Sequence, residues 1–266
     1  FPKRFIEAGI AEASAISIAG GLASEGQIPF YVNFATFVTG TAWTQVRQSA
    51  YANLNVKMIG TYVGMDNGPD GASHHANEDI ALMRMIPNMK ILVPSNIKEL
   101  KQSIKIAIEC DGPVYIRVTR DVVPDIDLEQ DSQMGKSIIV KDYGNDFALL
   151  YEGTTTGLSY EAFEELKRKG YNGKLINVFS IKPIDIELIN NLASTVKGVV
   201  TVENHSIFGG LGGAVAEIVA QKPQHAKIAY IGVQDVFTES GKALDVKEKY
   251  GLNIKNVVTT VETVMQ

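Results

Sequence analysis

The sequence has 266 residues, of which 45% are hydrophobic, so it can bury one large core or two ordinary ones. Its formal net charge is -5 and 21% of its residues are charged, which argues against a basic nucleic-acid-binding face. No apolar run reaches about 18 residues, so we expect no membrane span, and we recognise no signal peptide.

The opening segment raises a question about one carboxylate. The sequence begins at Phe1, and residues 5–15, FIEAGIAEASA, read as the tail of a strand that runs into a helix. We therefore expect a domain that lacks its N-terminal strand, with processing or a floppy leader as the alternative. Glu12 lies at the junction among apolar neighbours. By itself it reads as a helix N-terminal carboxylate that the helix dipole stabilises.

Strand and helix patterns alternate through the first half of the chain. The patterns predict helices over residues 12–26, 40–52, 80–85 and 97–110, and strands over 28–34, 56–60, 90–94 and 114–118. Such alternation is typical of a parallel sheet with helices on both faces. From about residue 122 to 144 the sequence is acidic and weakly periodic, and it reads as a linker.

A second unit of the same kind follows the linker. It has expected strands over 147–152, 174–178, 198–203 and 228–231, and expected helices over 157–169, 186–193, 209–220, 242–250 and 253–264. The fold class is therefore α/β, with two domains that are each a mostly parallel sheet with helices on both faces. We place the domains at residues 1–124 and 145–266, joined by a linker over 125–144.

Two phenylalanines follow the strand at 28–34 with a spacing of three residues. Such a spacing can place the rings of Phe34 and Phe37 on one side of a turn, where they form an apolar platform for a planar heterocycle. Packing in the core is the simpler interpretation, and spacing alone favours it.

A polar loop, TYVGMDNGPDGASHHANED, spans residues 61–79. It follows a strand of a parallel sheet, where such sheets build their ligand sites, and His74 and His75 can exchange protons near neutral pH. Adjacent histidines lack the spacing of a zinc pair on one helix face, and cysteine ligands are missing. A solvated loop with capping aspartates is the equal alternative.

Arg120 ends the strand VYIRVTR at the expected carboxyl edge of the sheet. This position suits a substrate phosphate or carboxylate, although a surface ion pair is slightly favoured without other information. In the second unit, residues 209–213, GGLGG, precede a helix but lack the G-x-G-x-x-G spacing of a dinucleotide site. These glycines are better explained by a helix start that packs closely on a sheet or on another subunit.

Three features that the sequence lacks narrow the range of possible functions. Cys110 is the only cysteine, so no intrachain disulfide can form, and we expect a reducing, cytoplasmic compartment. The G-x-x-x-x-G-K-[ST] loop of P-loop NTPases does not occur. The G-x-S-x-G elbow of many hydrolases does not occur either.

Considered together, the motifs resemble transketolase. The segments GIAEASAISIAGGLASEG, NFATFVTG, DGASHHANEDIALMRMIPNMKILVPSN and GPVYIRVTR are similar to the pyrimidine-binding domain of thiamine-diphosphate enzymes. That group includes transketolase, deoxyxylulose-phosphate synthase and the β subunits of 2-oxoacid dehydrogenases. The segments INVFSIKPID, TVENHSIFGGLGGAV and IGVQDVFTESG continue the resemblance. It implies a pyrimidine-binding domain over 1–124 and a transketolase C-terminal-like domain over 145–266.

The resemblance implies roles for particular residues. Glu12 matches the glutamate held against N1′ of the cofactor's aminopyrimidine, where a carboxylic acid favours the 4′-imino tautomer that takes the thiazolium proton. Phe34 and Phe37 match the positions that stack on this ring. Asp70 and His74 match the DG-x-x-H motif that contacts the sugar, and His74 is expected to be catalytic with Glu12.

The substrate side departs from the family pattern. Arg120 matches the arginine that binds the sugar phosphate, and Glu78 aligns without an assigned role. Many transketolases have a histidine where this chain has Tyr62, and an aromatic residue or arginine where it has Gly40. We therefore expect Tyr62 to contact the substrate, and the sugar preference stays open.

The family's GDG motif, with an asparagine downstream, is missing from this sequence. That motif binds diphosphate and magnesium through oxygen ligands. The resemblance thus implies a C-terminal subunit of a split transketolase, without metal ligands of its own. An N-terminal partner subunit would supply the diphosphate and Mg site in a heterotetramer. A missing N-terminal half of the same chain is the alternative.

The expected activity is the transfer of a two-carbon ketol unit from a ketose phosphate to an aldose phosphate, as in the pentose phosphate pathway. The alternatives are a β subunit of a 2-oxoacid dehydrogenase, an enzyme like deoxyxylulose-phosphate synthase, and a non-catalytic scaffold subunit. The paired histidines and Arg120 lean away from the dehydrogenase. A buried Glu12 would argue against a scaffold, because an idle site gains nothing from burying a carboxylate.

Overall fold

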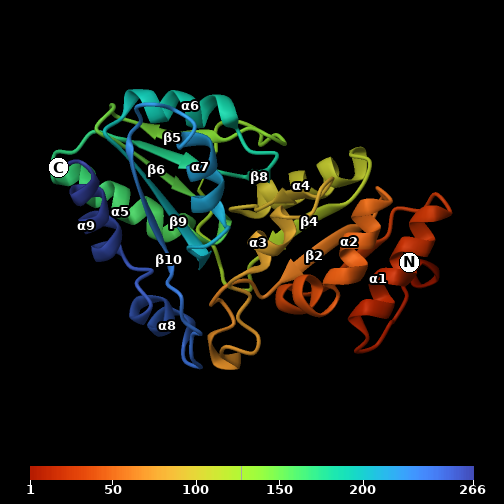
Figure 1. Cartoon of the computed structure of the whole chain (residues 1–266). Helices are drawn as coiled ribbons and strands as arrows, with labels where there is room; N and C mark the ends of the chain where they lie inside the picture. The colour runs from red at the N-terminus through yellow and green to blue at the C-terminus, as the bar shows by residue number, and fades with distance from the viewer. Residues whose placement is uncertain (127) are drawn as a thin grey trace.

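A computed structural model describes residues 1–126 and 128–266 as two α/β units that lie side by side (Figure 1). Each unit has a five-stranded sheet, with the strand orders β1-β2-β4-β3-β8 and β10-β9-β6-β7-β5. The fold-class prediction is confirmed. Residue 127, inside the expected linker, lies outside the described residues. In the part of the chain that the structure describes, no helix is long and apolar enough to cross a membrane.

The first sheet has four parallel strands and helices on both faces. The strands are β1 (Phe30–Phe34), β2 (Lys57–Thr61), β3 (Lys90–Leu92) and β4 (Val114–Val118), and the helices are α1 (Glu12–Ser24), α2 (Trp43–Tyr51), α3 (Asp79–Arg84) and α4 (Ile97–Glu109). Successive residues of a strand point to opposite faces. In β4, Tyr115 joins the core under α1 to α3, whereas Ile116 joins the core under α4.

The second sheet has parallel strands with one antiparallel edge. Its strands are β5 (Ile138–Asp142), β6 (Phe147–Tyr151), β7 (Lys174–Asn177), β9 (Gly198–Ser206) and β10 (Lys227–Val233), and its helices are α5 (Thr156–Arg168), α6 (Ile186–Thr195), α7 (Leu211–Val219), α8 (Ala243–Lys249) and α9 (Ile254–Val264). Helices α5 and α9 cover one face of this sheet and α6 and α7 the other (Figure 1).

Two short strands differ from the expected domain layout. β5 lies in the segment that reads as a linker and pairs antiparallel with β7. β8 (Ser180–Lys182) follows β7 in sequence but pairs antiparallel with β3, so a segment of the second half completes the first sheet. The two units also share one apolar core, in which Ile91 of β3 and Ile181 of β8 are both buried.

The expected strand at the start of the chain is not observed. Pro2–Arg4 form a short 3-10 helix, and residues 5–10 lie outside any helix or strand. A strand needs a neighbour that satisfies its backbone N–H and C=O groups, and this segment pairs with none in the described residues. Its apolar side chains, Phe5 and Ile6 among them, are exposed. The apolar composition of residues 5–10 therefore suggested a strand that does not form, because these residues have no strand to pair with in the described part of the chain.

The turn after β1 also differs from the predicted helix over 40–52. A π-helical turn, η2 (Phe37–Thr41), precedes α2 and places Phe37 at its first residue. π-Helical turns are often found at functional sites because the extra residue redirects a side chain. This turn brings Phe37 back toward the end of β1.

Candidate active site

Four of the predicted site residues form one aromatic cluster. The ring centroid of Phe34, at the end of β1, lies 5.7 Å from that of Phe37 and 4.3 Å from that of Tyr62. The His74 ring lies 5.7 Å from Phe34 and 5.2 Å from Phe37. The Phe34 and Phe37 rings meet at 69°, so they form an edge-to-face pair rather than one flat platform. The end of β1 with its following turn and the loop between β2 and α3 therefore converge here.

Tyr62 connects this cluster to Arg120. The Arg120 guanidinium lies 5.2 Å from the centroid of the Tyr62 ring, within the range of a cation–π contact, and the Arg120 side chain is exposed. Tyr62 has a positive φ of 58°, which is uncommon for a non-glycine residue. Such strain occurs preferentially at functional sites. The predicted phosphate-binding arginine is thus free to face solvent beside the aromatic cluster.

The adjacent histidines have different surroundings. His74 is half-buried, and its Nδ1 lies 2.9 Å from the hydroxyl oxygen of Ser73. His75 is buried, and its Nδ1 lies 2.6 Å from the hydroxyl oxygen of Thr238 in the second unit. Burial lowers the pKa of His75, and the nearby backbone of Gly68 and Asn67, followed by the negative charge of exposed Asp70, partly offsets this effect. The His74 ring is therefore part of the aromatic cluster at the site, whereas the buried His75 ring links the same loop to the second unit.

Glu12 is the first residue of α1, and its side chain is half-buried. Helix α1 packs against β1 and η2, the two elements that carry the phenylalanines. Burial raises the pKa of the Tyr31 phenol, and the nearby Glu12 charge raises it further. Asn33 donates a hydrogen bond to the Tyr31 oxygen over 2.9 Å. Tyr31 thus lies near Glu12, Asn33 is its hydrogen-bond partner, and no sequence pattern singled out either residue.

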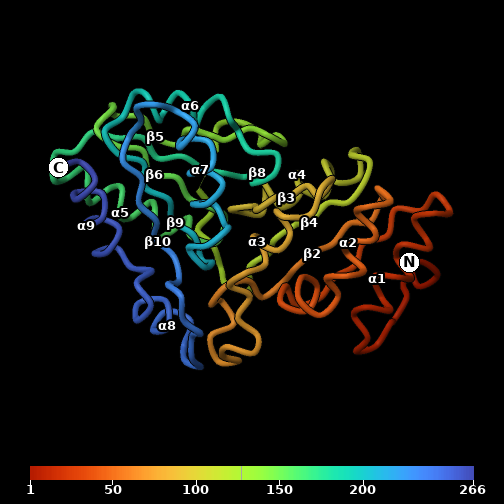
Figure 2. The backbone as a smooth tube through the Cα atoms, in the orientation of Figure 1, coloured from red at the N-terminus to blue at the C-terminus, as the bar shows by residue number. Residues whose placement is uncertain are grey.

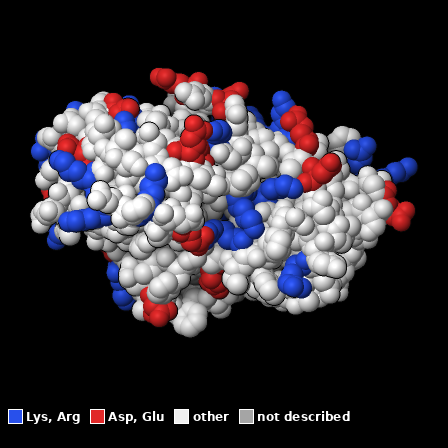
Figure 3. Space-filling view, turned by 45° about the horizontal axis from the view of Figure 1, so that its top comes forward, with Lys and Arg blue, Asp and Glu red and all other residues white. Residues whose placement is uncertain are grey.

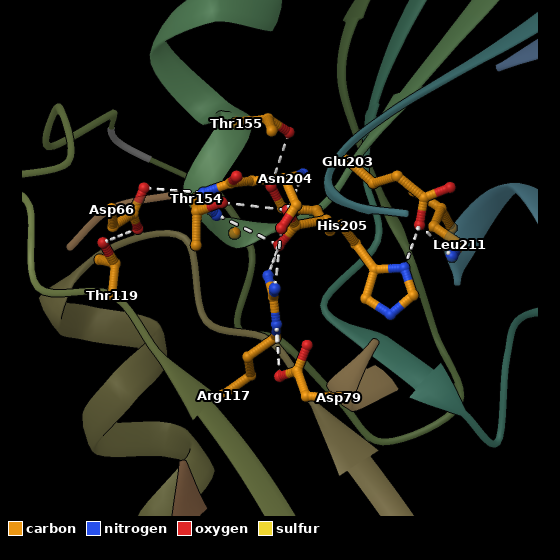
Figure 4. A network of polar contacts seen from close by, with 12 residues as sticks. Asp66, Asp79, Arg117, Thr119, Thr154, Thr155, Glu203, Asn204, His205 and Leu211 are labelled. Atoms are coloured by element: carbon orange, nitrogen blue, oxygen red, sulfur yellow. Dashed lines mark hydrogen bonds and ion pairs between the residues drawn. The ribbon is translucent and has the colours of Figure 1, made fainter. Parts of the chain in front are cut away.

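A buried ionic network lies beneath the loop that follows β2 (Figure 4). Arg117 of β4 is fully buried and donates to Asp79 over 2.8 Å and to Glu152 over 3.2 Å. The Tyr115 hydroxyl also donates to Asp79, over 2.7 Å. Burial alone would raise the pKa of Asp79, but the charge and hydrogen bond of Arg117 outweigh it and hold that pKa below its usual range. Glu152 belongs to the second unit, so this network joins the two.

A carboxylate cap at the start of α7 explains the glycines of the GGLGG segment, residues 209–213. The Glu203 carboxylate accepts hydrogen bonds from the backbone N–H groups of Leu211 (2.6 Å) and Gly212 (3.0 Å) at the start of α7. A Cβ on Gly210 would lie 1.9 Å from a Glu203 oxygen, so only glycine leaves room for this cap. Burial raises the pKa of Glu203 to about 7. The predicted close packing of the helix start on the sheet is observed, and no nucleotide is needed to explain it.

Metal ligands do not gather among the residues that the structure describes. No group of three or more His, Cys, Asp or Glu side chains within 1–126 and 128–266 is arranged to hold a metal ion. Charges of both signs are mixed on the face shown in Figure 3. The side chains that the structure brings together at the site are the rings of Phe34, Phe37, Tyr62 and His74, with the Arg120 guanidinium beside them.

Comparison with known proteins identifies the family. Residues 1–125 match the family model for the transketolase pyrimidine-binding domain, and residues 135–257 match the model for the transketolase C-terminal domain. A putative transketolase C-terminal section from Methanocaldococcus jannaschii is 40% identical over 98% of this chain and 83% of its own length. The chain belongs to the transketolase family. This transketolase-family chain is also 37% identical to a 6-deoxy-6-sulfo-D-fructose transketolase subunit of Clostridium sp. (strain MSTE9), over 100% of this chain and 82% of that subunit.

Solved structures of transketolases have the same fold. A split gene transketolase, described as an inactive beta4 tetramer, superposes with a TM-score of 0.92 and 38% identity, over 100% of this chain and 85% of that one. The transketolase of Campylobacter jejuni superposes with a TM-score of 0.84 over 97% of this chain and 39% of its own. At 21% identity this second similarity concerns the fold alone.

Proposed function

We propose that this chain is the C-terminal subunit of a split, thiamine-diphosphate-dependent transketolase. The proposed reaction moves a two-carbon ketol unit from a ketose phosphate to an aldose phosphate. The convergence of Phe34, Phe37, Tyr62, His74 and Arg120 on one site carries this proposal, because these are the positions that the transketolase motifs assign to cofactor and sugar. The single cysteine supports the cytoplasm as the proposed location.

The residues present fit the pyrimidine end of thiamine diphosphate. Half-buried rings at Phe34 and Phe37 offer apolar surface to a planar heterocycle, and Glu12 lies on the helix that packs against both of their elements. When bound, thiamine diphosphate supplies the electron-accepting thiazolium ring that stabilises a carbanion. In this proposal Glu12 holds a proton at the N1′ nitrogen, and the two rings orient the aminopyrimidine and exclude water from it.

The sugar phosphate is proposed to lie against the other half of the site. Arg120 can pair with a phosphate because its guanidinium is exposed and presents several donors. His74 can donate to or accept from a sugar oxygen near neutral pH. Asp70, exposed on the same loop, can accept hydrogen bonds from sugar hydroxyls. Tyr62 is the member of the aromatic cluster that contacts Arg120, and its side chain can select among sugars there.

The partner is proposed to be an N-terminal transketolase subunit that carries the ligands for diphosphate and Mg. The family models that match this chain cover the pyrimidine-binding and C-terminal domains. The proposed complex is a heterotetramer of two such chains and two partners. Similar proteins described as a C-terminal section and as a split gene transketolase in an inactive beta4 tetramer support an oligomer that needs a partner subunit. In such a complex the diphosphate end and the pyrimidine end of the cofactor would lie on different polypeptides.

A panel of substrates tests the proposed function. The purified chain, mixed with a candidate N-terminal subunit, thiamine diphosphate and Mg, should transfer ketol units from ketose phosphates to aldose phosphates. The panel should also contain 6-deoxy-6-sulfo-D-fructose and apulose 4-phosphate, the sugars named for similar subunits. Turnover of 2-oxoacids alone would favour the dehydrogenase, and deoxyxylulose phosphate formation would favour the synthase. No turnover by a complex that binds cofactor would favour a scaffold.

Removal of the exposed guanidinium tests the phosphate assignment. Arg120→Met should raise the KM for a sugar phosphate by about 10- to 100-fold with little change in kcat, since a hydrogen bond to a charged group contributes about 1.5–3 kcal/mol. Steady-state kinetics with phosphorylated and unphosphorylated forms of one sugar measure this effect. The unphosphorylated sugar is the control, and the two proteins should use it equally well. An unchanged KM for the phosphorylated form would contradict the assignment.

A further inference from the structure

The loop that bears the proposed sugar contacts packs on the second unit. We call residues 62–78, between β2 and α3, the site loop; it carries Tyr62, Asp70 and His74. Figure 2 shows the site loop beside the segment that leads into α8. Met65 of this loop is fully buried in the apolar core of the second unit, with residues of β9 and α9. The site loop therefore packs on both units: Met65 lies in the core of the second, whereas Val63 and Ala76 lie in a buried cluster with Ala35 of the first.

Asn204, at the end of β9, holds the start of the site loop. Its side-chain oxygen accepts a hydrogen bond from the Met65 N–H over 3.0 Å, and its side-chain nitrogen donates to Asp66 over 2.7 Å. Its backbone N–H donates to Glu152 over 2.9 Å, and its carbonyl accepts from Arg117 over 2.9 Å. Because Asn204 is buried and bonded on all sides, its amide is fixed relative to both sheets.

Asp66 joins the site loop to the strand end that carries Arg120. The Lys247 ammonium of α8 lies 2.6 Å from one Asp66 oxygen, and the Thr119 hydroxyl donates to the other. Lys247 also lies 3.1 Å from the Asp121 carboxylate. Thr119 and Asp121 flank Arg120 in the sequence. Two ion pairs of Lys247 and one hydrogen bond of Asp66 therefore tie the site loop to both neighbours of the proposed phosphate ligand.

Thr238 supports the histidine end of the site loop. Its hydroxyl oxygen lies 2.6 Å from Nδ1 of His75, the residue after His74. Gly71 lies in the left-handed region with φ of 72°, and a Cβ there would lie 2.3 Å from the Ser240 hydroxyl oxygen. The site loop thus packs closely against the 233–243 segment.

We propose that Asn204, Lys247 and Thr238 are positioning residues for the sugar phosphate. They do not touch the cluster that faces the substrate; they act by fixing the site loop and the Arg120 strand end. This inference rests on the proposed function, because it assumes that the site loop faces a sugar phosphate. A misplacement of about 1 Å in a reacting group can cost about 100-fold in rate. The second unit therefore contributes to substrate use as well as to the fold.

Matched substitutions at Thr238 test the proposal. Thr238→Val keeps the shape of the side chain but removes the hydroxyl, whereas Thr238→Ser keeps the hydroxyl. In the complex with the partner, Thr238→Val should lower kcat/KM for the sugar phosphate about tenfold or more. Thr238→Ser should retain the wild-type value. Hydrogen exchange of residues 62–78 should accelerate in the Val variant alone, while the affinity for thiamine diphosphate stays unchanged.

A second pair of substitutions lies on α8. Lys247→Met should lower kcat/KM and accelerate hydrogen exchange of the site loop. Lys249→Met should do neither, since Lys249 pairs with Glu239 on the surface. The proposal is overturned if Thr238→Val and Lys247→Met keep wild-type kinetics, or if cofactor affinity and melting temperature fall in step with the activity. A wild-type complex without ketol transfer would overturn the proposed function, and this inference with it.

Discussion

Glu12→Gln should reduce ketol transfer by the reconstituted complex at least about 100-fold, the usual contribution of a positioned proton-transfer group. The glutamine amide can donate a hydrogen bond to N1′, but its N–H is not acidic, so it cannot supply a proton to that nitrogen. The substitution is nearly isosteric, and Glu12 is half-buried at the first turn of α1, so the fold should be retained. Measurement of kcat with the partner, cofactor and a ketose phosphate checks this expectation.

The control for Glu12 lies at the other end of the same helix. Glu25 is exposed where α1 ends, and Glu25→Gln should have wild-type activity. Both variants should have the same thermal unfolding midpoint as the wild type. If Glu12→Gln kept more than about a tenth of the wild-type rate, the proton-holding role would be wrong, because such a group is worth at least 100-fold.

Arg117→Met should destabilise the chain by about 3–5 kcal/mol, the usual cost of removing one partner from a buried ion pair. Methionine fills much of the same volume, but it leaves the Asp79 and Glu152 carboxylates buried without their cation. Each carboxylate comes from a different unit, so the contact between the sheets should weaken. Urea unfolding followed by circular dichroism measures the free energy of unfolding.

A surface arginine provides the comparison for Arg117. Arg168 pairs with Glu165 on α5, and its side chain is 73% exposed. Arg168→Met should change the free energy of unfolding by less than about 1 kcal/mol, because surface ion pairs contribute little. Equal stability losses in the two variants would show that the buried network does not join the units as described.

The α/β fold could be predicted because its main signals are local. β4 is rich in β-branched and aromatic residues, and α4 is preceded by Asn96, whose side-chain oxygen accepts a hydrogen bond from the Glu99 N–H over 2.9 Å. β8 could not be predicted, since its three residues form a strand only where β3 offers an edge. The opening segment was misread for the converse reason: it has an apolar composition and no partner strand in the described residues.

The candidate site was predictable only in part. Phe34, Phe37 and His74 were identified through family motifs, and the structure brings them together. The support beneath them was missed because its members lie far apart in the sequence; Asp66 and Asn204 are separated by 138 residues. Arg117, a charged residue in an otherwise apolar strand, was the available signal, because a buried charge requires partners.

Native mass spectrometry of the reconstituted protein tests the central claim, that one thiamine diphosphate site is shared between two polypeptides. The account predicts a complex of two of these chains with two N-terminal subunits that retains thiamine diphosphate and Mg. It also predicts that neither chain retains the cofactor alone. Cofactor bound by this chain without the partner, or a stable two-plus-two complex that binds none in excess cofactor and Mg, would contradict it.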